Sequence, residues 1–224
     1  LYEIARMGDV MFNAVKSAVT LQAQLEKSIA ITGAVAGANA QEVEMLGDAM
    51  IQMGTDVPIK FQKIGESMYD MASAGLNASE VLESMPKAIA LSAGVGEDLN
   101  QTIELLVSTV KGFDLEFSEA PRILDVFANS VAKSMGTIEK LQVSFARVAP
   151  IANQAGVSFE ETTAILSKLY DLGLRGSNAG TVLANVMTKL SSFTDQATES
   201  LEKVGLTVSD VSLEYNTLGE ALAK

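Results

Sequence analysis

The 224-residue sequence contains no cysteine, no histidine and no tryptophan, and only 5% of its residues are aromatic. Without cysteine there is no disulfide framework and no thiolate nucleophile, and without histidine there is no imidazole base. Zinc and copper sites normally use at least one of these two residue types. We therefore expect no metal site and no cofactor.

Positive charge is also scarce, because 16 Lys and Arg residues stand against 28 Asp and Glu residues, for a formal net charge of −12. Affinity for a nucleic-acid backbone comes mostly from Lys and Arg, so we expect no nucleic-acid binding by this segment. At 48% hydrophobic residues, the chain is too apolar for a disordered acidic tail. The composition indicates a folded, acidic, aliphatic protein.

Long hydrophobic runs are missing as well. The longest uncharged stretch, Ser28 to Gln41, is shorter than the roughly 18–20 residues that a membrane-spanning helix needs. Glu3, Arg6 and Asp9 interrupt the start of the chain, which therefore lacks the pattern of a signal peptide. The chain starts on Leu1, and we expect it to be a segment of a longer polypeptide.

Helical periodicity is the dominant pattern. Apolar residues spaced by three or four predict one long amphipathic helix over about residues 3–31: Met11, Ala14, Ala18, Leu21, Leu25 and Ile29. Gly33 and Gly37 follow and predict a hinge. We expect an all-α fold with a long N-terminal helical arm and Gly-rich hinge over residues 1–38. A compact multi-helix bundle of short capped helices is expected over residues 39–224.

Corners between these short helices carry a recurring pattern, in which a Gly is followed by an aliphatic residue or Phe, a polar residue and then acidic residues. Its copies begin at Gly75, Gly112, Gly156 and Gly205. Gly readily adopts the left-handed backbone that ends a helix, and Ser or Asn caps the next one. Acidic residues then suit the positive end of the helix dipole. Each copy therefore predicts a tight helix–helix corner.

The Gly-rich stretch from Gly173 to Thr181 is the strongest candidate for a binding site. Its backbone amides could hold an anion at a helix N-terminus, with Arg175 alongside. However, it follows a predicted helix rather than a strand and lacks the Gly-Lys-Ser/Thr ending of a nucleotide-binding loop. The alternative is another helix corner, capped by Ser177 or Asn178, in which Gly180 permits close packing. We favour this second interpretation, because capping accounts for every residue.

Paired carboxylates are the remaining candidates for catalysis, at Glu97–Asp98, Asp114–Glu116 and Glu160–Glu161. Each pair lies at a predicted helix start, where the helix dipole already explains acidic residues. Several methionines fall at helical spacing and are interpreted as core-filling residues rather than as a binding surface: Met45, Met50, Met53, Met68, Met71 and Met85. No catalytic, cofactor-binding or metal-ligating residue is predicted.

Several blocks resemble the core domain of phage tail tape measure proteins. One is the stretch from Met68 to Leu76, followed by Val81 to Pro86. The most specific block is similar to the family signature Gly-Ile-x-Gly-Ser-x-Ala-Gly-Thr-x-Leu-Arg and shares with it Gly173, Gly176, Ser177, Ala179, Gly180, Thr181 and Leu183. Ala184 replaces the final Arg, and Pro58 to Phe61 replaces the usual Ser-x-x-Glu start. The resemblance runs from about Gly47 to the C-terminus.

This resemblance implies a non-enzymatic structural segment that helps to set tail length and assemble the tail tube, and that leaves the tail during genome delivery. The implied partners are tail tube and tail-tip proteins, tail assembly chaperones and further copies of the chain. The implied location is the lumen of the virion tail, after synthesis in the bacterial host cytoplasm, with membrane contact only during infection.

Two other functions stay open on the sequence alone. A mean hydropathy of +0.24 and the apolar stretch around residues 31–40 motivate a membrane-active, pore-forming helical bundle. An enzyme acting on cell-wall glycan is motivated only by the presence of such domains elsewhere in tape measure proteins.

Overall fold

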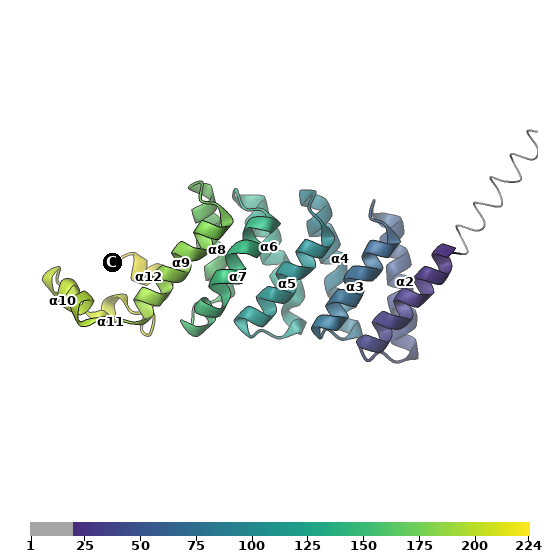
Figure 1. The fold of residues 1–224 in the computed structure, drawn as a ribbon, viewed down its shortest axis with the longest axis horizontal. Coiled ribbons are helices and arrows are strands. Elements are labelled where there is room, and N and C mark those ends of the chain that lie inside the picture. Colours follow the sequence, from purple (N-terminus) through teal and green to yellow (C-terminus); the bar gives the residue numbers. More distant parts are fainter. Residues whose placement is uncertain (1–19) are drawn as a thin grey trace, which may run out of the picture. The chain divides into compact units, whose positions relative to one another are not determined.

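The computed structural model describes residues 20–224, and every regular element among them is a helix (Figure 1). The all-α prediction is confirmed for these residues. The chain divides into two compact units, residues 1–86 and residues 87–224.

The first unit contains a helix described over residues 20–35, followed by α2 (Ala40–Asp56), α3 (Phe61–Ala74) and the first half of α4 (Ala78–Val95). The second unit begins with the rest of α4. It continues with α5 (Leu99–Phe113), a short 3₁₀ helix η1 (Phe117–Glu119), α6 (Ala120–Lys133), α7 (Ile138–Gln154), α8 (Phe159–Asp171), α9 (Gly176–Ser191), α10 (Asp195–Lys203), α11 (Val208–Val211) and α12 (Leu218–Leu222).

The helices form successive hairpins. A residue with positive φ ends the first helix of each hairpin, and these residues recur at intervals of 38, 39 and 42: Gly37, Gly75, Asp114 and Gly156. A left-handed residue reverses the chain and leaves the last carbonyls of the helix hydrogen-bonded. The regular interval indicates a structural repeat of one helical hairpin.

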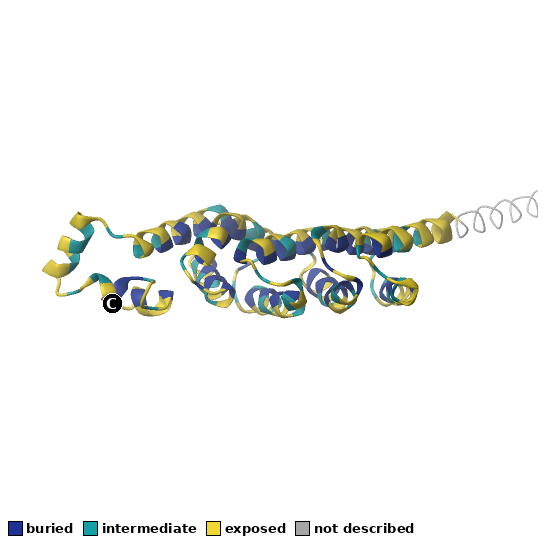
Figure 2. Ribbon diagram, turned by 90° about the horizontal axis from the view of Figure 1, so that it is seen from below, coloured by how far each residue is buried: buried dark blue, intermediate teal, exposed yellow. Residues whose placement is uncertain are grey.

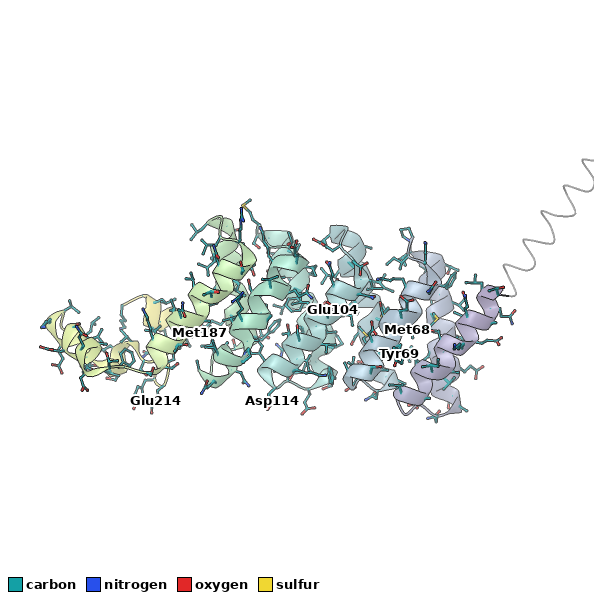
Figure 3. All side chains as sticks on the ribbon, viewed as in Figure 1. Met68, Tyr69, Glu104, Asp114, Met187 and Glu214 are labelled. Atoms are coloured by element: carbon teal, nitrogen blue, oxygen red, sulfur yellow. The ribbon has the colours of Figure 1, made fainter. Side chains whose placement is uncertain are left out.

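At the predicted corners, Gly75, Gly156 and Gly205 have φ angles of 124°, 71° and 79° and lie one or two residues after the end of a helix. The expectation for Gly112 is wrong. Gly112 lies inside α5, and the left-handed residue of this corner is Asp114, with a φ of 54° (Figure 3). Gly112 instead packs against α7, because a Cβ atom added to it would lie 2.7 Å from the Cβ of Ala149.

Helices of the second unit lie in two rows, with α5, α7 and α9 in one and α6 and α8 in the other (Figure 1). Hydrogen bonds within each row join residues about one hairpin apart. Gln142 of α7 donates to Glu104 of α5, 38 residues away, and the hydroxyls of Ser130 and Ser167, 37 residues apart, join α6 to α8. Successive helices of a row therefore run parallel to one another.

The core of the second unit lies between the two rows, where the buried residues face one another (Figure 2). Four phenylalanines from α5, α6, α7 and α8 meet there, with neighbouring ring centroids 5.4–5.9 Å apart: Phe113, Phe127, Phe145 and Phe159. Edge-to-face contacts such as these add to the stabilisation that burial alone provides.

Most methionines of the described residues fill the cores, as predicted. Met50, Met68, Met71, Met85 and Met187 are fully buried (Met68 and Met187 are labelled in Figure 3). Met45 and Met135 differ, because they are 50% and 63% exposed.

The expected arm is only partly described, because residues 1–19 lie outside the described residues. The helix continues to residue 35 and passes through Gly33, so Gly33 does not form a hinge. A Cβ atom added to Gly33 would lie 2.6 Å from Val43, and one added to Gly47 would lie 3.2 Å from Ile29. Residues 20–35 thus pack against α2 within the first unit. The structural division falls after Pro86, and a separate domain over residues 39–224 stays a prediction.

None of the helices described over residues 20–224 is long and apolar enough to span a membrane.

Candidate functional site on helix α9

The Gly-rich stretch forms the corner between α8 and α9 and the first half of α9. Gly173 takes a φ of 85° just after α8, and the N–H of Leu174 donates to the carbonyl of Leu169. Arg175 is the N-cap of α9, and its side chain makes no capping hydrogen bond. The expectation that Ser177 or Asn178 is the N-cap is therefore wrong. Both lie in the first turn, because α9 begins at Gly176, where it already contacts α7.

Helix α9 approaches the backbone of α7 very closely. A Cβ atom added to Gly176 would lie 2.7 Å from the carbonyl oxygen of Lys140, and one added to Gly180 would lie 2.7 Å from that of Ser144. Real Cβ atoms essentially never approach within 3.0 Å, and the obstructing atoms belong to a helix backbone that cannot move aside. Residues four apart share one helix face, so two glycines on α9 meet two turns of α7. Only glycine fits at either position.

A buried hydrogen-bonded cluster accompanies this approach. The Ser144 hydroxyl donates to the carbonyl of Gly176 at 2.6 Å, and the Tyr170 hydroxyl donates to Ser144 at 2.7 Å. The Tyr170 hydroxyl also lies 3.1 Å from the carbonyl oxygen of Lys140. The cluster therefore joins α7, α8 and α9 and satisfies their polar groups where the helices are closest.

Burial raises the pKa of Tyr170 to about 12, and the hydrogen bond to Ser144 acts in the opposite direction. Tyr170 is therefore neutral at physiological pH. The Lys140 ammonium lies 5.7 Å from the centre of the Tyr170 ring and donates to the carbonyl of Met135, so this cation joins Tyr170 of α8 to the corner between α6 and α7.

The other signature residues complete the helix. Ala179 and Leu183 are buried, whereas Thr181 is exposed and donates to the carbonyl of Ser177. Ala184, which stands where the signature has Arg, is also buried. Residue 184 therefore cannot form the ion pair that an Arg at this position could form.

Asp98, Glu160 and Glu161 from the carboxylate pairs have structural partners. Asp98 caps α5 by accepting from the amide of Asn100, Glu160 forms an ion pair with Arg122, and Glu161 accepts from the amide of Gly219 in α12. Glu116 is the N-cap of η1, whereas Asp114 is the C-cap of α5, so the expectation that this pair lies at a helix start is wrong for Asp114. Within residues 20–224 there is no group of three or more Asp, Glu, His or Cys residues that could hold a metal ion. The arrangement fixes helices against one another.

The sequence alone does not indicate three residues of this site: Lys140, Ser144 and Tyr170. Tyr170 and Ser144 are 26 residues apart in the sequence, and Ser144 and Gly176 are 32 apart. Within the apolar stripe of α7, Ser144 stands beside the buried Phe145 and gives no local sign of an interhelical role. Only the stacking of hairpins brings the three residues to the signature.

Comparison with known proteins decides the family. Residues 47–224 match the family described as phage-related minor tail protein. The chain belongs to this family. The resemblance found in the sequence is confirmed, and family membership gives this tail protein segment a structural role in the phage tail.

Individual relatives agree. The segment is 28% identical over 211 residues to the tape measure protein of Pneumococcus phage Dp-1, covering 94% of the segment and 18% of that relative. It is 26% identical over 172 residues to the probable tape measure protein of Escherichia phage P2, covering 77% of the segment and 21% of that relative. A third relative, the probable tape measure protein of Clostridium phage phiCD119, is 24% identical over 217 residues, with 87% and 23% covered. The segment spans about a fifth of the length of these relatives.

Proposed function

We propose that this chain is a helical segment of a tail tape measure protein, which helps to set tail length and to assemble the tail tube. The observation that carries the proposal is the similarity to the tape measure protein of phage Dp-1, which extends over 94% of the chain. The family match includes every helix of the second unit. The helix-packing role of the signature residues supports a mechanical role rather than a chemical one.

The mechanism is geometric. As one continuous helix, the chain would be about 336 Å long at a rise of ~1.5 Å per residue. In the hairpin array, each hairpin adds only the spacing of neighbouring packed helices, about 8–10 Å. The length that this segment contributes to a tail therefore depends on which of the two forms it takes there.

Its surroundings follow from the same proposal. Tail tube and tail-tip proteins, tail assembly chaperones and further copies of the chain are the partners, in the lumen of the virion tail after synthesis in the bacterial host cytoplasm. The segment leaves the tail during genome delivery and meets a membrane only then. Its net charge of −12 disfavours binding to the phage DNA, which occupies the same tail. The role needs no catalysis. The pore-forming alternative is not favoured, because no helix described in residues 20–224 is long and apolar enough to span a membrane.

The test changes the number of hairpins in the full-length parent protein. In the phage that encodes this chain, residues 138–175, which form α7, α8 and their corners, are deleted in frame or duplicated, and tails are measured by electron microscopy. We expect shorter and longer tails respectively. The change is about 57 Å for an extended helix at ~1.5 Å per residue, and about 10 Å for the folded array.

A substitution that keeps the number of residues serves as the control. Gly94→Ala introduces a Cβ atom with no neighbour within 4 Å and should leave tail length unchanged. Tails of unaltered length after both the deletion and the duplication would contradict a tape measure role.

A further inference from the structure

After α9 the chain forms a loop whose two ends are joined by a hydrogen bond. It leaves α9 after Ser191, and it returns at Leu213, whose amide donates to the carbonyl of Leu190 at 3.1 Å. Helices α10 and α11 lie between these points. This hydrogen bond joins the two ends of the loop and involves no residue of α10.

Helix α10 itself is weakly attached. None of its residues is buried. The side-chain interactions found for it within residues 20–224 are local: Thr194 caps its first turn, Ser200 donates to the carbonyl of Gln196, and Lys203 pairs with Glu199. Little of the folded structure would be lost if α10 changed position.

A groove separates α10 from the end of α9. Its volume is about 550 Å³, and its apolar lining comes from α9, α10, α11 and the segment between α9 and α10: Leu190, Phe193, Ala197, Leu201 and Val211. Ala197 and Leu201 are four residues apart, so they form one side of α10. Glu199 lies between them in sequence, on the opposite side, and is exposed. The apolar side of α10 thus borders a groove that it does not fill.

Short non-helical segments flank α10. Ser192 to Thr194 precede it, and Val204 to Thr207 follow it, with Gly205 at a φ of 79°. Changes of backbone angle in a few residues at the ends of an element are enough to move that element as a body.

We propose that α10 is a hinged strap, which closes as an intact helix over this groove and reopens. Closing removes the apolar lining from water, which is favourable, and α10 leaves the position seen here at little cost because none of its side chains is buried there. The strap alternately covers and exposes an apolar surface at the end of α9. This inference concerns local geometry and does not depend on the proposed tail function.

The absence of cysteine from the natural chain allows a direct test. Leu190→Cys and Leu201→Cys are combined in the 224-residue chain, and disulfide formation under mild oxidation is followed on non-reducing gels. Closure brings these two residues together, so we expect rapid formation of an intramolecular disulfide. The matched control combines Leu190→Cys with Glu199→Cys, which lies on the opposite side of α10, and should form its disulfide at least tenfold more slowly.

Three results would overturn the proposal. Equal rates for the two pairs would mean that α10 unfolds rather than moving as a helix. No disulfide in either pair would mean that the groove stays open. A disulfide between two chains in place of the intramolecular one would mean that the groove takes α10 from a second copy.

Discussion

The Ser144 hydroxyl donates a 2.6 Å hydrogen bond to the carbonyl of Gly176, from the middle of α7 to the first residue of α9. This bond is short because Gly176 and Gly180 allow the two helix backbones to approach closely. Tyr170 of α8 donates to the same hydroxyl and thereby connects the second row of helices to the contact. The contact between α7 and α9 is therefore fixed by glycines and by hydrogen bonds together.

The two hydroxyls should act as one unit in unfolding experiments. Ser144→Ala removes the hydroxyl that donates to the Gly176 carbonyl and accepts from Tyr170, and should lower the free energy of unfolding by about 1–3 kcal/mol, at about 0.5–1.5 kcal/mol for each hydrogen bond. Tyr170→Phe should lower it by about 0.5–1.5 kcal/mol. In urea unfolding, the double variant should lose at least ~0.5 kcal/mol less than the sum of the single variants. Strict additivity would show that the hydroxyls contribute independently.

Alkaline stability should report the burial of Tyr170. Its pKa is raised to about 12 in the folded chain, against about 10 in an unfolded one. Because the folded state holds this proton more tightly, the stabilisation is fully present below pH ~10 and is lost as the pH rises through 12. The loss approaches about 3 kcal/mol. Tyr170→Phe should remove this part of the pH dependence in urea unfolding between pH 9 and 12. An unchanged dependence would mean that Tyr170 ionises normally.

A second glycine contact can be tested by exchanging the two residues. Gly112→Ala places two Cβ atoms about 2.7 Å apart and should destabilise the chain by about 1–3 kcal/mol. Ala149→Gly alone should cost about 1 kcal/mol, because Gly is a poorer helix former than Ala. The double variant restores one Cβ atom at the contact, so its free energy of unfolding should exceed that of Gly112→Ala. No recovery in the double variant would contradict the close contact between α5 and α7.

The sequence predicts the local features of this fold well. Positions such as Gly75 and Gly156 follow from the residues beside them, because a left-handed glycine and a capping side chain lie within a few residues of one another. Gly112 shows where local reasoning fails. Its surroundings resemble a corner, but its role depends on Ala149, which belongs to the next hairpin.

The stacking of the hairpins could not be deduced in the same way. The hydrogen bond between Gln142 and Glu104 joins residues 38 apart, and the sequence around either residue does not predict its partner. The family signature is recognisable as a sequence motif. That its glycines face the backbone of Lys140 and Ser144 became visible only with α7 in place.

The central claim is that the signature glycines of α9 are present because no larger residue fits against α7. The most direct measurement is the free energy of urea unfolding of Gly180→Ala beside Gly94→Ala, which also replaces a helical glycine. Ala favours a helix at both positions, by up to about 1 kcal/mol. At Gly94 nothing lies within 4 Å, so this variant should be as stable as the parent or more stable. At Gly180 the new Cβ atom would lie 2.7 Å from the Ser144 carbonyl oxygen, so we predict a loss of about 1–3 kcal/mol. Equal stabilisation by both substitutions would contradict the account.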